Sequence, residues 1–312
     1  MASTPRPGVA PEADADNNHV VEGEFNWLVR SVGAGIGMLL ALAVALGAAT
    51  ALNSEAGGLG AIANGLLVSE VVFAAILILL GSTVESYGFG LALGTQWPYT
   101  KNIVVLTLAG DPEAAHRLVA TLVGLVAVAL AVIDPVSQNF FGLGLIVATA
   151  LFGMGTLYVL AGRAPAFVHG THGLLAYGVL ITYLIELAHP SMSIVSYVAS
   201  VDPIRSILFA IFMGGMVTGH RGFGQPIGSF YKPEKPAQWV FAVHGLSALL
   251  VVGILGWTMP AYPVAFLLAV TQTAVGFGVF HAVNLKPKAP GTVVAFHQTM
   301  ALLITTAIVM AW

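Results

Sequence analysis

The chain has 312 residues, of which 57% are hydrophobic and only 8% are charged. An average soluble domain carries roughly 25% charged residues, so this chain has too few to cover a soluble surface of its size. Its 11 basic and 14 acidic residues leave no basic footprint for nucleic acid. The absence of cysteine excludes disulfides, thiolate catalysis, iron–sulfur clusters and cysteine-ligated zinc. Redox or metal chemistry is left to nine histidines and a few carboxylates.

Residues 1–26 are polar and contain three prolines, which predicts a flexible tail. They lack the basic start and the early apolar stretch of a signal peptide. After them come nine apolar spans, each long enough to cross about 30 Å of hydrocarbon. We expect these spans at residues 28–51, 64–92, 117–133, 139–161, 168–188, 204–219, 239–257, 262–281 and 292–311. The sequence therefore predicts an all-α integral membrane protein of about nine spans, as in a prokaryotic plasma membrane.

Turn-forming residues separate the spans, and two of the breaks are longer than the rest. The break at residues 93–115 contains Trp97 and Tyr99, aromatic residues typical of a membrane–water interface. The break at residues 220–238 is rich in glycine, proline and aromatic residues. Residues 191–203 are expected to form a short amphipathic segment on the membrane surface.

Four histidines recur at matched positions, each at the start of an apolar span: His116, His172, His244 and His297. Each is followed four residues later by an alanine. The separations within the pairs are 56 and 53 residues (172 − 116 and 297 − 244). The separations between the pairs are 128 and 125 residues (244 − 116 and 297 − 172). This matched spacing predicts a duplicated four-helix unit.

The repeat divides the chain into a tail, one extra helix and two halves. We expect the extra N-terminal transmembrane helix at residues 27–60. Residues 61–190 and 191–312 then form two pseudo-symmetric four-helix bundles. The helices that start at His116 and His172 are two crossings apart, so they run in the same direction. Both histidines of a half therefore lie at the same membrane face.

Two histidines from facing helices of a bundle are the natural axial ligands of a haem. A residue at i+4 lies on the same helix face one turn along, and alanine there leaves room for a flat macrocycle. A single histidine at a helix end is more often an interfacial or packing residue, but four at matched positions are hard to assign to chance. Neither half offers a compact carboxylate–histidine cluster for zinc. The pattern favours one bis-histidine haem site in each half.

The segment DPEAAHRL at residues 111–118 resembles a motif of the haem A synthase family. That family carries Glu-x-x-His-Arg at the start of the second helix of its N-terminal half. It has a second histidine in that half and two more in the C-terminal half, which here match His172, His244 and His297. The resemblance covers residues 68–312 as an eight-helix layout in two halves.

The resemblance implies a membrane oxidoreductase that converts the C8 methyl group of haem O into the formyl group of haem A. Haem O, the substrate, would lie between His116 and His172, and a haem b cofactor between His244 and His297. Glu113 matches the essential carboxylate of the family. The implied partners are membrane lipid, the haem substrate, an electron acceptor, and a respiratory oxidase or a haem O synthase, with no nucleic acid.

Three features depart from the family pattern. The span at residues 28–51 is additional, and the cysteine pair of some family members is absent. Basic residues gather on the histidine side of the predicted topology, and only Arg205 is clearly opposite. The positive-inside rule would place the histidine side in the cytoplasm, whereas the family holds its haems toward the outer face. Binding of haem propionates also explains the basic residues, so both orientations stay open.

Glu113 lies three residues before His116 and shares its helix face, so its carboxylate can reach the edge of a haem ligated there. Its counterpart in the second half is Phe241, which leaves only the first half with an acid beside its ligand. Such an acid can take up a proton or stabilise a developing cation. The alternative is a solvated acid favoured by the helix dipole. Arg117 is expected either to bind a haem propionate or to anchor the helix at the interface.

His169 lies three residues before His172 and is an alternative ligand, although the repeat favours His172. Three carboxylates, at Glu70, Glu85 and Glu186, fall within apolar spans. Carboxylates are costly inside a membrane and usually face a bundle interior or a water path. These three are candidates for proton transfer or for hydrogen bonding between helices.

Two other functions fit the same pattern. A dihaem b-type cytochrome subunit that passes electrons from quinol in a respiratory complex would use the same four histidines and give Glu113 no catalytic role. A transporter or an assembly subunit without cofactor can also be built from repeats. The presence and the chemical kind of bound haem would separate the three functions.

Overall fold

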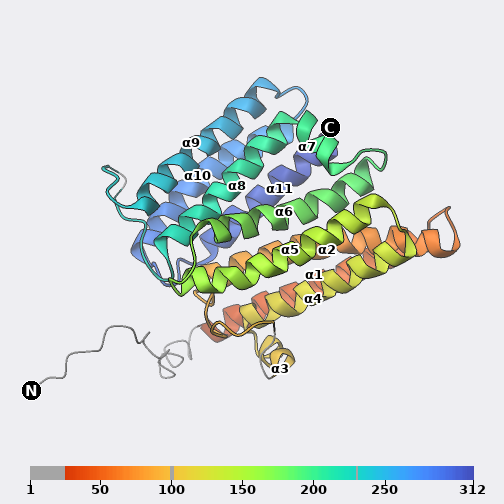
Figure 1. Ribbon diagram of the computed structural model, residues 1–312, viewed down its shortest axis with the longest axis horizontal. Helices are drawn as coiled ribbons and strands as arrows, with labels where there is room; N and C mark the ends of the chain where they lie inside the picture. Colours follow the sequence, from red (N-terminus) through yellow and green to blue (C-terminus); the bar gives the residue numbers. More distant parts are fainter. Residues whose placement is uncertain (1–24, 99–101, 230) are drawn as a thin grey trace, which may run out of the picture.

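Figure 1 shows the computed structural model, in which long helices run roughly side by side. The structure describes residues 25–98, 102–229 and 231–312, with side chains from residue 34 onward. Within those ranges there are eleven helices and no strand. The flexible tail predicted at residues 1–26 lies almost wholly outside the described residues.

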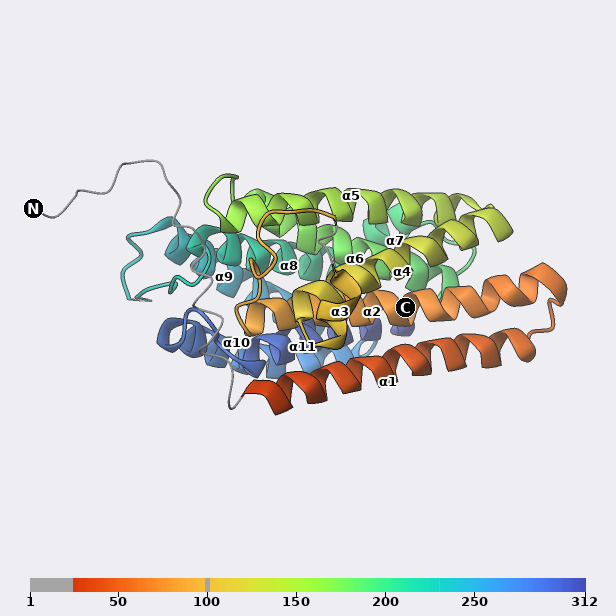
Figure 2. The same ribbon diagram turned by 90° about the horizontal axis from the view of Figure 1, so that it is seen from below.

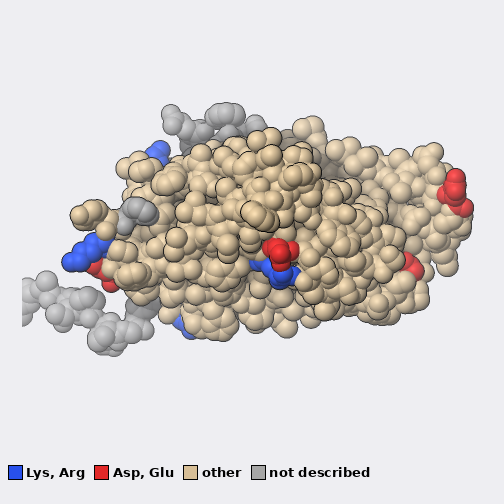
Figure 3. Space-filling model, turned by 90° about the horizontal axis from the view of Figure 1, so that it is seen from above, with Lys and Arg blue, Asp and Glu red and all other residues tan. Residues whose placement is uncertain are grey.

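Nine helices are long: α1 Phe25–Leu52, α2 Gly58–Ser86, α4 Pro112–Ile133, α5 Ser137–Leu160, α6 Phe167–Ala188, α8 Asp202–Arg221, α9 Pro236–Trp257, α10 Pro263–Leu285 and α11 Thr292–Ala311. Two are short: α3 Ile103–Leu108 and α7 Ile194–Ser200. Eight of the described helices are long and apolar enough to cross a membrane, and the pair α7–α8, bent by 98°, makes a ninth if it counts as one span. On the face shown in Figure 3, charged side chains are sparse; one group of both signs lies near the middle, and the others lie toward the two ends. The prediction of an all-α integral membrane protein is confirmed.

The structure differs from the prediction at one span and adds one short helix. The second span was expected at residues 64–92, but α2 covers Gly58–Ser86, so that prediction is wrong by six residues at each end. The ends are set by glycines in the left-handed region, Gly57 with φ 66° and Gly88 with φ 74°, a conformation that favours glycine. Helix α3 was not predicted, because six residues are too few to show helical periodicity.

The long helices form two rings of four. In the first ring α2 contacts α4, α4 contacts α5, α5 contacts α6, and α6 closes onto α2; helices α8, α9, α10 and α11 contact one another in the same order. The rings meet through α6 against α8 and α2 against α11, with α6 also touching α11. Exchanging α2 with α8 and α6 with α11 reproduces these contacts, as expected for a duplicated unit. Helix α1 lies outside the first ring beside α2 (Figure 2).

The core lies where α6 passes between the two rings. Every residue from Val179 to Glu186 is buried, so this part of α6 has no lipid-facing side. Near its start α6 approaches α8 so closely that a Cβ on Gly215 would lie 2.7 Å from the Cα of Gly170. Small residues at such crossings are typical of helix packing in membranes. Helix α6 thus fixes the position of one half against the other.

Helix starts at one end of the bundle follow directly from the sequence. Pro112 and Pro236 occupy the first turns of α4 and α9, where proline is tolerated because no intrahelical N–H is needed. Asp111 caps α4, since its Oδ1 accepts a hydrogen bond from the Ala114 backbone N–H at 2.9 Å. Burial raises the pKa of the Asp111 carboxyl, although this backbone hydrogen bond acts in the opposite direction.

The same end of the bundle is cross-linked between the halves. Arg221, at the end of α8, forms an ion pair with Glu85 of α2 and donates a hydrogen bond to the Pro287 carbonyl at 3.2 Å. The Gly291 N–H donates to the Ser86 carbonyl at 2.8 Å. These contacts join the C-terminal ends of α2 and α8 to the turn between α10 and α11.

Candidate functional site

The four repeat histidines lie four, five, eight and five residues after the first residues of α4, α6, α9 and α11. Because these helices alternate in direction with α2, α5, α8 and α10, all four start at the same end of the bundle (Figure 1). The imidazoles therefore lie in one layer near that end, and each ring is half-buried.

Each of these histidine rings rests on a glycine of the preceding long helix. The four contacts pair Gly81 with His116, Gly153 with His172, Gly214 with His244, and Gly276 with His297. A Cβ added to the glycine would lie 3.2, 3.1, 3.2 and 3.4 Å from the Cε1 atom of the respective ring. A larger side chain at any of the four glycines would collide with the imidazole. We call this arrangement, repeated on four helix pairs, the glycine socket.

The sockets also orient the rings. The Nδ1 atom of His172 lies 3.0 Å from the Thr149 carbonyl, and that of His244 lies 3.1 Å from the Ala210 carbonyl. Each carbonyl stands one turn before the socket glycine. A carbonyl only accepts hydrogen bonds, so Nδ1 carries the proton and Nε2 keeps a free lone pair. Histidines that bind metals are commonly held by such a hydrogen bond to the second ring nitrogen.

The other two histidines are held less tightly. The ring of His116 faces the Leu77 carbonyl, again one turn before its socket glycine. The Nδ1 atoms of His116 and His297 have no hydrogen-bond partner of good geometry among the described residues. For His297, the residue one turn before the socket glycine is Gln272. Its side-chain Nε2 donates a hydrogen bond to the His297 carbonyl at 2.9 Å. Each half thus combines one firmly oriented imidazole with one that is freer to adjust.

The C-terminal pair is spaced for a single shared metal. The ring centres of His244 and His297 lie 6.3 Å apart, with 73° between the ring planes. A histidine nitrogen lies about 2 Å from a bound metal, so two imidazoles on opposite sides of one ion have centres about 6 Å apart. Each ring can turn about its own metal–nitrogen bond, so the interplanar angle does not exclude this. His116 and His172 lie within electrostatic reach of each other.

The donor set fits a haem better than a bare metal ion. In the part of the chain that the structure describes, no three His, Cys, Asp or Glu side chains come together to hold a metal. Each pair would supply two imidazole nitrogens as ligands, and a porphyrin would supply the remaining donors that its iron needs. Four alanines stand one helical turn after the repeat histidines, and their small side chains leave room beside the imidazoles for a flat ligand: Ala120, Ala176, Ala248 and Ala301.

Glu113 is buried and fully engaged. Its Oε1 accepts from Arg117 Nη2 at 2.6 Å, and its Oε2 accepts from the Leu93 backbone N–H at 2.9 Å. Arg117 also donates to the Gln96 carbonyl at 2.6 Å, so the pair ties α4 to the segment that follows α2. The alternative of a solvated acid is wrong, because Glu113 is only 4% exposed. The catalytic role of Glu113 and the propionate-binding role of Arg117 stay predictions.

His169 has no glycine socket. It faces the ion pair of Glu85 and Arg221, and its Nδ1 is buried without a hydrogen-bond partner among the described residues. His172 has both the glycine contact and the oriented Nδ1. The structure therefore favours His172 over His169 as the ligand, in agreement with the repeat.

The socket glycines could not be singled out from the sequence. The chain has 36 glycines, and in membrane helices glycine is common simply because it allows close helix packing. The available signal was a glycine near the C-terminal end of each apolar span that precedes a repeat histidine. That signal becomes specific only when the structure places the ring against the glycine.

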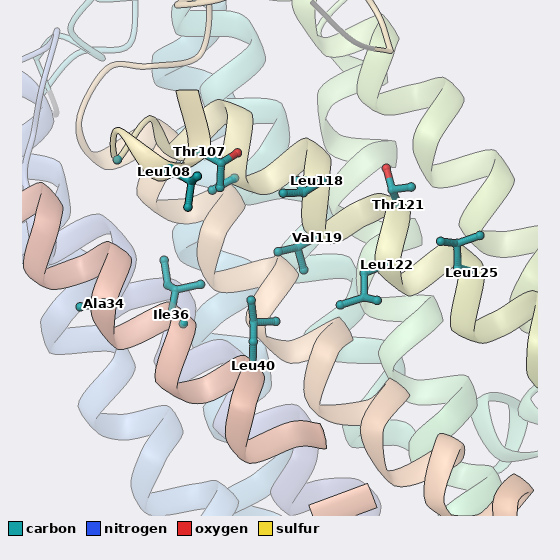
Figure 4. A pocket seen from close by; sticks show the side chains of 13 residues that line it. Ala34, Ile36, Leu40, Thr107, Leu108, Leu118, Val119, Thr121, Leu122 and Leu125 are labelled. Carbon is teal, nitrogen blue, oxygen red and sulfur yellow. The ribbon is translucent and has the colours of Figure 1, made fainter. Parts of the chain in front are cut away.

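A groove with no titratable side chain lies outside the histidine layer. It has a volume of about 550 Å³ and is lined by α1, α3 and α4, with Leu40, Leu108 and Leu122 among its walls (Figure 4). Its lining offers two threonine hydroxyls and no acid or base. It approaches the site at Ala115, the neighbour of His116, and at Leu118, the neighbour of Arg117.

No protein-family model, curated protein or solved structure matches the chain. The resemblance to haem A synthases therefore rests on the residues described above. The function has to be argued from the histidine layer and its surroundings.

Proposed function

We propose that the protein is a bis-histidine haem-binding membrane oxidoreductase of the haem A synthase type. In this proposal His116 and His172 hold haem O, whose C8 methyl group is oxidised to a formyl group. His244 and His297 hold a haem b. The observation that carries the proposal is the glycine socket, repeated four times, with the Nδ1 atoms of His172 and His244 held by backbone carbonyls.

A bound haem would supply redox chemistry that no side chain of this chain provides. The residues of the chain bind and orient it. The hydrogen bonds of His172 and His244 hold one imidazole of each half in place, which lowers the entropy lost when a ligand binds. The surrounding helices are apolar and keep water away from the ring layer. Arg117 and Glu113 fix the segment after α2, so the N-terminal half is closed by an ordered loop.

Pigment extraction tests this function. The full chain is expressed in a host that makes haem O, purified in detergent, and its haems are separated by chromatography. We expect a Soret band, haem b in the protein, and haem A that appears only when the protein is present. Unchanged haem O in a haem-loaded protein would contradict the reaction while leaving haem binding intact. A purified protein without any haem would contradict both.

One observation favours a second function, a dihaem b-type cytochrome. Both carboxylate oxygens of Glu113 already have partners, so this acid is not free to act on a substrate in the described conformation. A cytochrome needs only the four imidazoles. It would contain two haem b groups, would be reduced by quinol and would form no haem A.

Enlarging a socket glycine should weaken haem binding in its own half only. In Gly214→Leu the new side chain occupies the place of the His244 ring, because even a Cβ would lie 3.2 Å from its Cε1 atom. Displacing a ligand in this way is expected to weaken haem affinity by about 10- to 100-fold in the C-terminal half. The measurement is haem content per polypeptide with spectral titration.

Gly245→Ala is the matched control for this variant. Gly245 lies in α9 next to His244, and a Cβ there would meet nothing within 4 Å. The control should retain both haems. Equal haem content in Gly214→Leu and Gly245→Ala would contradict the role of the sockets.

A further inference from the structure

A second set of polar side chains lies inside the N-terminal half, away from the histidines. Glu70, on α2, is 0% exposed, and neither of its carboxyl oxygens has a hydrogen-bond partner in the described part of the chain. Tyr183, on α6, is also 0% exposed, and its hydroxyl likewise has no partner there. An unpaired buried charge is very costly in such surroundings, whereas a neutral acid is tolerated. Two unpartnered polar groups at one depth need an explanation.

Glu70 and Tyr183 lie on helices that contact each other, α2 and α6. Tyr183 is within electrostatic reach of both Glu70 and Glu186. Its ring fills the space over Gly142 of α5, where a Cβ would lie 2.6 Å from the hydroxyl oxygen. Glycine at this position therefore makes room for the tyrosine between the two acids.

Glu70, Tyr183 and Glu186 together form what we call the row. Glu186 is its outermost member and lies nearest the end of the bundle opposite the histidines. It lies one turn beyond Tyr183, and its carboxyl faces the Asn139 side chain and the carboxylate of Asp134. The Asn139 side chain donates to the Asp134 carbonyl at 2.8 Å. Asp134 is half-buried at the end of α4 and meets the surface there.

The row opens at the end opposite the histidines. Glu70 lies 11 residues before Gly81 (81 − 70), and Tyr183 lies 11 residues after His172 (183 − 172). At 1.5 Å per helical residue, both lie about 16 Å from the histidine layer. Helix α6 ends at Ala188, only five residues beyond Tyr183 (188 − 183). The row therefore joins the far surface to an inner point below the N-terminal histidine pair.

The second half has no such row. Counted from the socket residues, Glu70 corresponds to Pro203, and Tyr183 and Glu186 correspond to Ile308 and Ala311. A role in helix packing common to both duplicates would not require acids in only one of them. The described part of α1 and the part of α11 beyond His297 contain no titratable side chain that would neutralise Glu70.

We propose that Glu186, Tyr183 and Glu70 form a proton-transfer path that opens at the face opposite the histidines and ends at Glu70. A proton from water at that face is taken up by the Glu186 carboxylate. No direct hydrogen bond joins Tyr183 to either acid in the described structure, so the path includes a bridging water at each step. Glu186 passes a proton through one water to the Tyr183 oxygen as the Tyr183 hydroxyl proton moves through a second water to the Glu70 carboxylate. Only O–H bonds form and break, and the path exists whether or not haem is bound.

Hydrogen–deuterium exchange at Glu70 tests this path without any haem. The infrared carbonyl band of a protonated carboxylic acid is recorded while the full-length protein is transferred to D₂O, and Glu70→Gln identifies which band belongs to Glu70. We expect fast exchange in the unchanged protein. Removing the tyrosine hydroxyl in Tyr183→Phe should slow the exchange of Glu70 by at least about tenfold.

Tyr177→Phe is the matched control. Tyr177 is a buried tyrosine of the same helix whose hydroxyl donates to the Gln298 carbonyl at 3.3 Å, away from the row. It should leave the exchange of Glu70 unchanged. If Tyr183→Phe fails to fold, as judged by gel filtration, Glu186→Gln provides the same test. Equal exchange in the unchanged protein and in the row variants, or no protonated band from Glu70, would overturn the proposal.

Discussion

Replacing His244 and His297 together by alanine should empty the haem site of the C-terminal half and leave the other half loaded. The distance between these two imidazoles suits ligation of one iron. Both imidazoles lie on helices of the second four-helix ring, α9 and α11. Removing both leaves that half without either of its repeat imidazoles to ligate the iron, so occupancy there should fall to the background level. The same double change at His116 and His172 should empty the N-terminal half. Haem per polypeptide and a redox titration measure both outcomes.

His189→Gln controls for the loss of a half-buried imidazole. His189 lies at the opposite end of the bundle, where its Nε2 is 2.9 Å from the Val309 carbonyl and its ring contacts Tyr197 and Trp312. Glutamine can keep the hydrogen bond to that carbonyl, so both haems should remain. Retention of two haems in either double variant, or loss of both haems from each, would contradict the assignment of one pair to each half.

Arg117→Ala should strongly destabilise the N-terminal half. The side chains of Arg117 and Glu113 are 8% and 5% exposed, so removing the guanidinium leaves a buried carboxylate without its counter-charge. Breaking one partner of a buried pair costs about 3–5 kcal/mol. The hydrogen bond to the Gln96 carbonyl is lost as well. Thermal unfolding in detergent should show a clearly lowered midpoint.

The double variant Glu113→Gln with Arg117→Met separates structure from chemistry. It removes both charges at once, so most of the stability lost in Arg117→Ala should return. If the double variant folds and binds both haems but forms no haem A, Glu113 takes part in the reaction. If the unchanged protein converts haem O and the double variant converts it equally well, Glu113 serves only to hold the loop.

The membrane class and eight of the nine predicted spans could be predicted from the sequence, and the repeat of four histidines is visible in it; the predicted span at residues 204–219 counts only together with α7. Apolar runs and matched spacing are local or periodic signals, and the bundle forces histidines at co-directional helix starts into one layer. The ends of α2 were misplaced, because apolar residues continue past Ser86 while Gly88 ends the helix.

Contacts between distant segments were beyond the reach of the sequence. The sequence placed Glu85 in an apolar span but gave no sign that Arg221, in the other half, would be its partner. Glu113 was expected to point toward a haem edge, yet the Leu93 amide, 20 residues earlier, binds one of its oxygens. In both cases a charged group is satisfied by a partner that only the packing of whole helices brings near.

Both histidine pairs lie at one end of the helices, and this bears on the membrane potential. An electron that passes between the two halves travels parallel to the membrane plane and crosses none of the transmembrane voltage. Moving a unit charge across the whole membrane changes its free energy by about 2.3 kcal/mol per 100 mV of membrane potential. The membrane potential contributes almost nothing to the free energy of this lateral step. Its driving force should therefore be the same in energised and de-energised membranes, whereas proton entry from the far face toward Glu70 should respond to the applied voltage.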